Sequence, residues 1–141
     1  MKAARPAKII VTGSQDQPAP VIRALAQAGF TLRLTRSGTE VLRAAAKDEV
    51  DAVVLDIDLP DVNGFEVCRR LKTNANTAHI QVVFVSSLYG LAEGAMIASR
   101  LGAVGYLTKP VESRDLVNVI NLAICKRDLQ LQRSARATQS A

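Results

Sequence analysis

The stretch "DAVVLDIDLPDVNG", residues 51–64, places four apolar residues in a row ahead of two carboxylates that stand two positions apart. Residues 52–56 are apolar on both faces until the last one, the pattern of a strand that helices cover on both sides. This run ends on Asp56, and a loop rich in turn-forming residues follows. Because functional residues of such sheets lie at the carboxyl ends of strands, the pattern predicts that Asp56 is a functional acid.

The alternation of strand and helix continues on both sides of this stretch. Further strands are predicted at 8–12, 31–35, 80–86 and 103–108. The helices between and after the strands begin near Pro20, Ser37, Gly64, Ala92 and Leu116. The start of the second helix is marked by a capping box, because Glu40 stands three residues after Ser37. Five strand–helix units with short loops predict an α/β fold, with a five-stranded parallel sheet and helices on both faces.

The composition is that of a soluble globular domain. The chain has 141 residues, of which 48% are hydrophobic and 22% charged. No apolar run approaches the length of a membrane span, and the N-terminal apolar run is too short for a signal peptide, so we expect a cytoplasmic location without membrane insertion. The two cysteines, Cys68 and Cys125, fit no metal or redox spacing. Each falls on an apolar helical stripe, so both are predicted to be small core residues.

The basic excess of the chain lies at its two ends. The net charge is +5, and residues 1–8 and 126–141 each contribute +3, which leaves −1 for the residues between them. A nucleic-acid surface would gather Lys and Arg on the folded part, so no nucleic-acid partner is expected for this domain. We predict a basic tail at 1–7, a folded domain at 8–125, and a basic helical extension or linker at 126–141.

Three chemically distinct side chains are expected at one edge of the sheet. Asp56, Ser86 and Lys109 each stand at or just after the end of a predicted strand. Each alone is weak evidence, because Asp and Ser often cap helices and Lys is usually solvated. Together they suit phosphoryl transfer, in which a carboxylate attacks phosphorus while cations and hydrogen-bond donors hold the phosphoryl oxygens. A metal ion would normally supply the remaining positive charge.

Residues 8 to about 125 resemble the receiver domain of bacterial two-component response regulators. The matching segments are "VVLDIDLPDVNGFEVCRRLK", "VVFVSS" and "LGAVGYLTKP", in the order and at the spacing of that family. The resemblance implies a flavodoxin-like (βα)5 fold with strand order 2-1-3-4-5. It also implies that Asp56 accepts a phosphoryl group from a sensor histidine kinase, and that Ser86 and Lys109 contact that group.

The resemblance also implies a switch and a contact surface. Tyr106 falls at the position of the switch aromatic, which moves inward when the Ser86 hydroxyl moves toward the phosphate, and the Lys109–Pro110 peptide bond is expected to be cis. Partners, or a second copy in a homodimer, would bind across the expected helix 92–102, strand 103–108 and the final helix. This surface is centred on Glu93, Arg100, Tyr106 and Arg114.

The sequence departs from the family at the end of the first strand, where two adjacent acids normally hold Mg²⁺. Here the sequence reads "IIVTGSQDQ". Alignment from Lys8 puts Gly13 and Ser14 at these positions, and alignment back from Gly29 puts Thr12 and Gly13 there. Neither register supplies a carboxylate. Because Mg²⁺ binds through carboxylates, carbonyls and water, the family's Mg²⁺ is expected to bind weakly in this chain.

Two other acids are candidates to replace the missing pair. The side chain of Asp58 points the same way as that of Asp56 if the strand stays extended, so Asp58 is either a metal ligand or a solvated loop acid. Asp16, in the first loop, is expected to be a turn residue. Without the acidic pair, the charges of Asp56 and Lys109 nearly cancel, and we expect a direct ion pair in a metal-free pocket.

Several functional readings stay open from the sequence. The leading one is a non-enzymatic receiver with impaired phosphorylation that works through protein contacts, a pseudo-receiver, with autophosphatase activity undecided. A normally phosphorylated receiver is the alternative. A haloacid-dehalogenase-type phosphatase also uses a D-x-D pair, but only Glu112 and Asp115 follow Lys109 as candidates for its further acidic motif. A nucleotide-binding Gly-rich turn is not present in the sequence. The polar C-terminal end is typical of a receiver that precedes an output domain.

Overall fold

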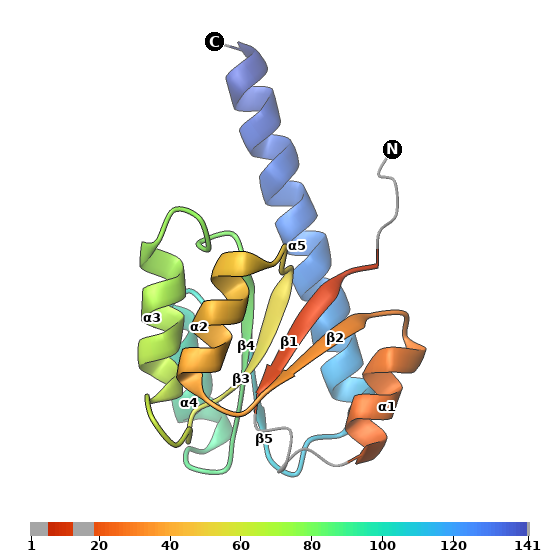
Figure 1. Cartoon of the computed structure of the whole chain (residues 1–141), viewed down its shortest axis with the longest axis vertical. Helices are drawn as coiled ribbons and strands as arrows, with labels where there is room; N and C mark the ends of the chain where they lie inside the picture. The colour runs from red at the N-terminus through yellow and green to blue at the C-terminus, as the bar shows by residue number, and fades with distance from the viewer. Residues whose placement is uncertain (1–5, 13–18, 141) are drawn as a thin grey trace.

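The computed structural model describes residues 6–12 and 19–140 of the chain, with side chains up to residue 133. This part forms a five-stranded parallel sheet with five helices (Figure 1). The elements are β1 Lys8–Thr12, α1 Ala19–Gln27, β2 Thr31–Thr35, α2 Gly38–Lys47, β3 Ala52–Asp56, α3 Gly64–Thr73, β4 Gln81–Ser86, α4 Leu91–Arg100, β5 Gly105–Thr108 and α5 Ser113–Ser140. The strand order is β2-β1-β3-β4-β5, which confirms the expected order.

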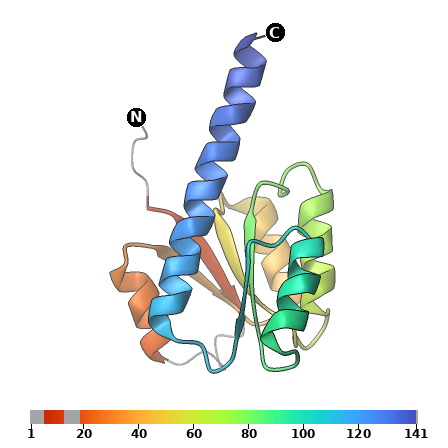
Figure 2. The same ribbon diagram turned by 180° about the vertical axis from the view of Figure 1, so that it is seen from behind.

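Helices cover both faces of the sheet. Figures 1 and 2 show α1 and α5 on one face, with α2, α3 and α4 on the other. Alternate residues of β1 point to opposite faces of the sheet. Ile9 and Val11 pack with α1 and α5, while Ile10 packs with the helices of the other face. Every residue of β3 is buried. The doubly covered central strand predicted from residues 52–56 is therefore confirmed.

The helix ends largely follow the sequence signals. The Ser37 hydroxyl accepts a hydrogen bond from the Glu40 N–H at 3.1 Å, as expected for an N-cap. The Glu40 carboxylate accepts from the Arg36 N–H instead of the Ser37 N–H, so the capping box is displaced by one residue. Strand β5 begins two residues later than predicted. The cause is the end of α4, where the Ala103 N–H donates to the Ala98 carbonyl at 2.9 Å.

The final helix corrects one prediction about the cysteines. Cys68 is buried, but Cys125 is exposed. On α5, Ala123 lies on the side that faces the sheet and Cys125 on the side that faces away. Helix α5 also continues without a break through the predicted extension to Ser140. Within the described segments, no helix is long and apolar enough to cross a membrane. Residues 1–5 of the predicted basic tail lie outside those segments.

Candidate functional site

The carboxyl ends of β3, β4 and β5 bring the predicted side chains to one edge of the sheet, at the bottom of Figure 1. Asp56 is the last residue of β3 and Ser86 the last of β4, and both are almost completely buried. Lys109 directly follows β5, and its N–H donates to the Ser86 carbonyl at 2.9 Å. The register of β4 and β5, which pairs Ser86 with Thr108, thus sets the place of the lysine.

Asp56 and Lys109 form a direct ion pair. The Lys109 Nζ lies 2.5 Å from the Asp56 Oδ2, and the other carboxylate oxygen accepts a hydrogen bond from the Asp58 N–H at 3.0 Å. The Asp56 side chain is 4% exposed and that of Lys109 is 25% exposed. Both carboxylate oxygens of Asp56 therefore have protein partners. The ion pair expected from the sequence is present.

Thr12 occupies the end of β1, next to the strand that carries Asp56. Its hydroxyl donates to the Val54 carbonyl at 3.1 Å and accepts from the Asp56 N–H at 2.7 Å. The side chain is fully buried. Hydrogen bonds of a neutral hydroxyl thus join β1 to β3 at a position where one of the two alignments expected an acid. Gly13, Ser14 and Asp16 lie outside the described residues.

The side chain of Asp58 does not lie beside that of Asp56 as a second candidate metal ligand. The chain stops being extended after the strand, because the Leu59 N–H donates to the Ile57 carbonyl at 3.2 Å and closes a tight turn around Asp58. Asp58 is exposed, and its backbone N–H is what reaches Asp56. Among residues 6–12 and 19–140, no group of three or more His, Cys, Asp or Glu is placed to hold a metal. Among these residues, Mg²⁺ would thus have to take most of its six oxygen ligands from backbone carbonyls and water.

Tyr106 lies inside the domain. Its side chain is 6% exposed, and its hydroxyl donates to the Tyr89 carbonyl at 2.9 Å. The ring lies directly on Gly94 of α4, where an added Cβ would come within 2.1 Å of a ring atom. Tyr106, expected as the switch aromatic and as one residue of the contact surface, is therefore buried beneath α4, and its role stays a prediction. The space left by Gly94, which the sequence reading missed, admits the ring.

Ser86 and Pro110 complete the predicted site. The Ser86 hydroxyl accepts a hydrogen bond from the Leu88 N–H at 2.9 Å, within the loop that leads to α4. The Lys109–Pro110 peptide bond is cis. The roles expected for Asp56, Ser86, Tyr106 and Lys109 in phosphoryl chemistry stay predictions, because these contacts describe positions and not reactions.

The loop after Asp56 is tied to the start of α2 by Asp61, a second residue that the sequence reading missed. Its carboxylate accepts from the Gly38 N–H at 2.8 Å, the Thr39 N–H at 3.0 Å and the Thr39 hydroxyl at 2.5 Å. The hydrogen bond from the Thr39 hydroxyl, followed by those from the two backbone N–H groups, holds the pKa of Asp61 well below its usual range. The free N–H groups at the start of a helix favour such a carboxylate.

Gly64 fixes the other end of this loop. Its N–H donates to the Ile57 carbonyl at 2.9 Å, and a Cβ at this position would lie 2.4 Å from the Asp56 carbonyl oxygen. The backbone of α3 can approach the end of β3 this closely only without a side chain.

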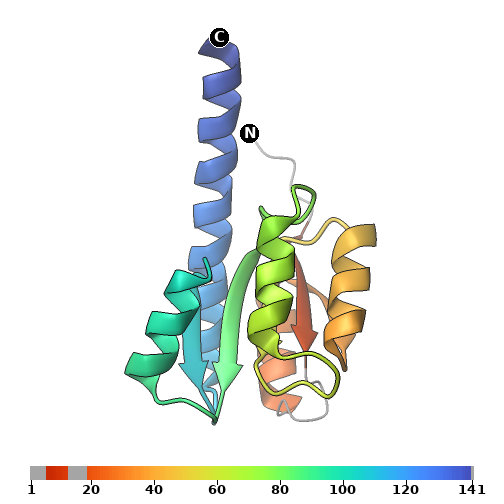
Figure 3. The same cartoon turned by 90° about the vertical axis from the view of Figure 1, so that its left-hand side faces the viewer.

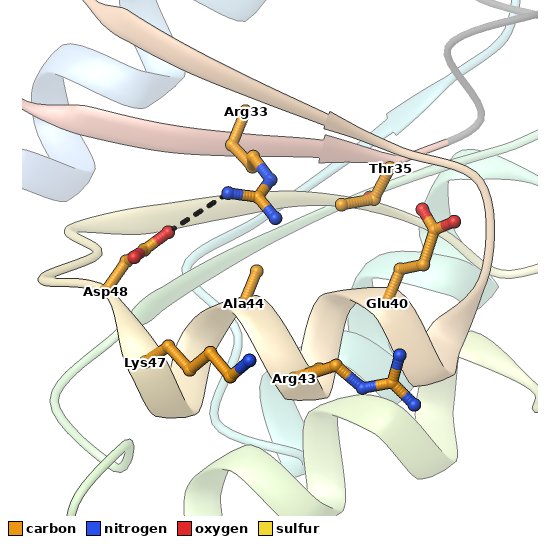
Figure 4. A pocket seen from close by; sticks show the side chains of 7 residues that line it. All are labelled: Arg33, Thr35, Glu40, Arg43, Ala44, Lys47 and Asp48. Carbon is orange, nitrogen blue, oxygen red and sulfur yellow. Dashed lines mark hydrogen bonds and ion pairs between the residues drawn. The ribbon is translucent and has the colours of Figure 1, made fainter.

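A surface hollow of about 320 Å³ lies elsewhere, along the edge strand β2 and helix α2 (Figure 4). Its lining residues are Arg33, Thr35, Glu40, Arg43, Ala44, Lys47 and Asp48. Arg33 pairs with Asp48 across it at 3.4 Å. Positive and negative side chains nearly balance here, and none of the predicted site residues lines the hollow, so it is separate from the Asp56 site.

The chain matches the response regulator receiver domain family over residues 9–121. It belongs to that family. The relatives include the response regulator PleD of Caulobacter vibrioides, 35% identical over 59% of this chain and 18% of PleD. The transcriptional regulatory protein TorR of Escherichia coli is 31% identical over 84% of this chain and 51% of TorR. A solved receiver domain from Clostridium thermocellum superposes with a TM-score of 0.76 at 30% identity, covering 88% of this chain and 98% of that one.

The chain thus spans about half or less of the length of these two curated relatives. Family membership places this receiver domain in two-component signalling, in which receivers are phosphoacceptors and generally not enzymes. The family match over residues 9–121 also gives no support to the haloacid-dehalogenase reading.

Proposed function

We propose that this receiver domain is phosphorylated poorly or not at all at Asp56 and acts largely through protein contacts, as a pseudo-receiver. The observation that carries the proposal is the ion pair between Lys109 Nζ and Asp56 Oδ2 at 2.5 Å. In a phosphoacceptor, the carboxylate must be available to attack phosphorus. Here the ammonium and the Asp58 N–H together occupy both of its oxygens.

The charge around the pocket supports this proposal. A transferring phosphoryl group spreads negative charge over its oxygens and needs several fixed positive partners. Lys109 supplies one such charge, and Ser86 supplies a neutral donor. The end of β1 adds only the Thr12 hydroxyl, which already bonds to the backbone of β3. With no carboxylate at either alignment of the acidic pair, little draws a divalent cation to this edge.

The inward position of Tyr106 supports a contact surface that can bind a partner without phosphorylation of Asp56. The ring is inward and bonded to the Tyr89 carbonyl while Asp56 is paired with Lys109. In the family pattern, the inward position follows from phosphorylation of the acid. In this chain, Gly94 offers the space for the ring whatever the state of Asp56.

The proposed partner surface covers α4, β5 and the first half of α5. Glu93, Arg100 and Arg114 are exposed there. Two apolar side chains of α4 are also largely exposed, Leu91 at 60% and Met96 at 53%. Apolar residues rimmed by charges fit a protein partner better than a small ligand. The partner is a sensor histidine kinase or another signalling protein, and a homodimer through this surface is the second candidate.

Beryllofluoride, a mimic of the phosphoryl group, tests the proposal together with acetyl phosphate. Each is added to the wild-type chain and to Asp56→Asn in the presence of Mg²⁺. We expect no stoichiometric acyl phosphate by intact mass and no beryllofluoride-dependent shift in amide resonances around Asp56. A stoichiometric adduct that is lost in Asp56→Asn would establish the alternative, a normally phosphorylated receiver.

A further inference from the structure

Helix α5 extends far beyond the domain that it helps to cover. Its 28 residues correspond to about 42 Å of helix at 1.5 Å per residue. Figures 1 and 3 show that its second half projects past the end of the sheet opposite the Asp56 edge. A helical segment without tertiary packing is only marginally stable in water, so a projecting half of this length would gain stability from a partner.

The outward side of α5 carries a short apolar stripe. The side chains that face the sheet are buried and are contributed by Leu116, Ile120 and Ala123. On the opposite side lie Leu122, 69% exposed, and Leu129, 53% exposed, with the exposed Cys125 between them. Their spacing of three and then four residues is that of the a and d positions of a two-stranded coiled coil.

An ion pair at the end of the sheet fixes the direction of this stripe. The Arg127 guanidinium contacts the carboxylate of Asp51, and these side chains are 12% and 1% exposed. Asp51 also accepts a hydrogen bond from the Lys8 N–H at 2.7 Å, which ties the pair to β1. Arg127 lies at the f position of the repeat, opposite the a and d positions. With its f position held against the domain, α5 presents Leu122, Cys125 and Leu129 to the outside.

We infer that this stripe binds a second copy of the same chain through a parallel pair of α5 helices. In a parallel pair, each g position lies beside an e position of the other helix. Asp128 at g would then lie beside Arg133 at e of the second copy. Asp128 contacts Arg127 at 2.7 Å within its own chain but keeps 31% of its side chain exposed. An antiparallel pair would instead bring Lys126 close to Arg133, two like charges.

The stripe has few apolar layers, so the dimer is weak and depends on protein concentration. At the d position, the two Cys125 thiols lie close to the two-fold axis. An added two-electron oxidant can therefore join their sulfurs in a disulfide, with the loss of two protons. This pairing does not depend on the phosphorylation state of Asp56. The stripe adjoins the proposed partner surface at Leu122, which lines a hollow with Gly105 and Tyr106 of β5. Met96 of α4 and Leu129 of α5 do not line this hollow, so they are the positions that separate the two interfaces by mutation.

Sedimentation equilibrium over a wide concentration series tests the pairing. We expect a concentration-dependent dimer that is lost in the double variant Leu122→Glu with Leu129→Glu. The matched control is Leu131→Glu, because Leu131 is 49% exposed on the same helix but lines a separate hollow of about 420 Å³ beside α2. A chain that stays monomeric throughout, or a dimer that Met96→Glu on α4 abolishes while the double variant keeps it, would overturn the inference.

Oxidative cross-linking tests the geometry. We expect a disulfide-linked dimer in the wild-type chain, none in Cys125→Ser, and none in Cys125→Ser with Leu131→Cys. The other cysteine, Cys68, is buried and does not interfere. Arg133→Glu tests the orientation, because it places like charges at the g–e contact and should weaken a parallel dimer. Cross-linking through residue 131, or a dimer strengthened by Arg133→Glu, would contradict the parallel arrangement.

Discussion

The carboxylate of Asp56 has two partners, the ammonium of Lys109 and the N–H of Asp58. A carboxylate that is 4% exposed needs such partners, because a buried charge without compensation is costly. In our proposal, the same partners make the acid a poorer nucleophile, because they compensate its negative charge. At the scale of single residues, the chemistry proposed for this chain depends on that balance of one negative and one positive charge.

Lys109→Met should lower the free energy of unfolding by about 1–3 kcal/mol, since it leaves the Asp56 carboxylate buried with one hydrogen bond. The loss should be smaller than for a fully buried pair, because Lys109 is 25% exposed and solvent screens its charge. Urea unfolding of Lys109→Met, Asp56→Asn and the double variant gives the coupling between the two residues. Additive losses in the double variant would show that the pair contributes no coupling.

Gly94→Ala should displace the Tyr106 ring from its inward position, because the new Cβ would lie about 2.1 Å from a ring atom. The chain has two tyrosines and no tryptophan, so near-ultraviolet circular dichroism and tyrosine fluorescence report directly on this change. Gly90→Ala is the matched control, because a Cβ there meets nothing within 4 Å. Equal spectra for the wild-type chain and Gly94→Ala would show that the glycine does not determine the ring position.

The contact between two elements, the β3–α3 loop and the start of α2, depends on the charge of Asp61. Three hydrogen bonds from Gly38 and Thr39 lower the pKa of this carboxyl group. A lowered pKa in the folded state means that the stabilisation is present above the ordinary pKa, near 4, and is lost as the pH falls below it. The loop that follows β3 should therefore be held against α2 at neutral pH and released in acid.

Asp61→Asn should reduce stability at pH 7, and the difference from the wild-type chain should shrink as the pH falls from about 5 to 2. Urea unfolding at several pH values measures this. Asp58→Asn is the control, since Asp58 is an exposed acid of the same loop. This substitution should change stability little at any of these pH values. If the loss of stability in Asp61→Asn is the same at every pH, then it does not come from the charge of the carboxylate.

The elements themselves could be predicted because their signals are local. Apolar runs mark the strands, and the capping serine and the helical repeats mark the helices. The roles of Thr12 and Gly94 could not be predicted, because each depends on a contact with a residue distant in the sequence. The exposure of Cys125 was missed for a related reason, since periodicity defines a stripe on a helix but not which stripe faces the sheet.

Across the whole molecule, the Asp56 edge and the projecting half of α5 lie at opposite ends of the sheet (Figure 1). The ion pair of Asp51 with Arg127 joins that helix to the far end of β3, the strand that ends on Asp56. The direction in which α5 leaves the domain is thus set by a contact with the central strand.

Arg127→Met should lower the free energy of unfolding by roughly 2–4 kcal/mol, because it leaves the Asp51 carboxylate buried with one charged partner removed. It should also speed amide hydrogen exchange in α5 after residue 126, where the helix loses its anchor. Arg133→Met is the matched control, an exposed arginine of the same helix. Unchanged exchange in Arg127→Met would show that the projecting helix does not need this pair.

Titration calorimetry with Mg²⁺ tests the central claim most directly. For the wild-type chain we predict no measurable binding in the range where receivers with an acidic pair bind the ion. The variant with Thr12→Asp and Gly13→Asp restores two carboxylates at the end of the first strand and should gain binding that is lost again with Asp56→Asn. If the wild-type chain binds Mg²⁺ as tightly as that variant, and Asp56→Asn removes the binding, then the pocket is an ordinary phosphoacceptor site and our account of it is wrong.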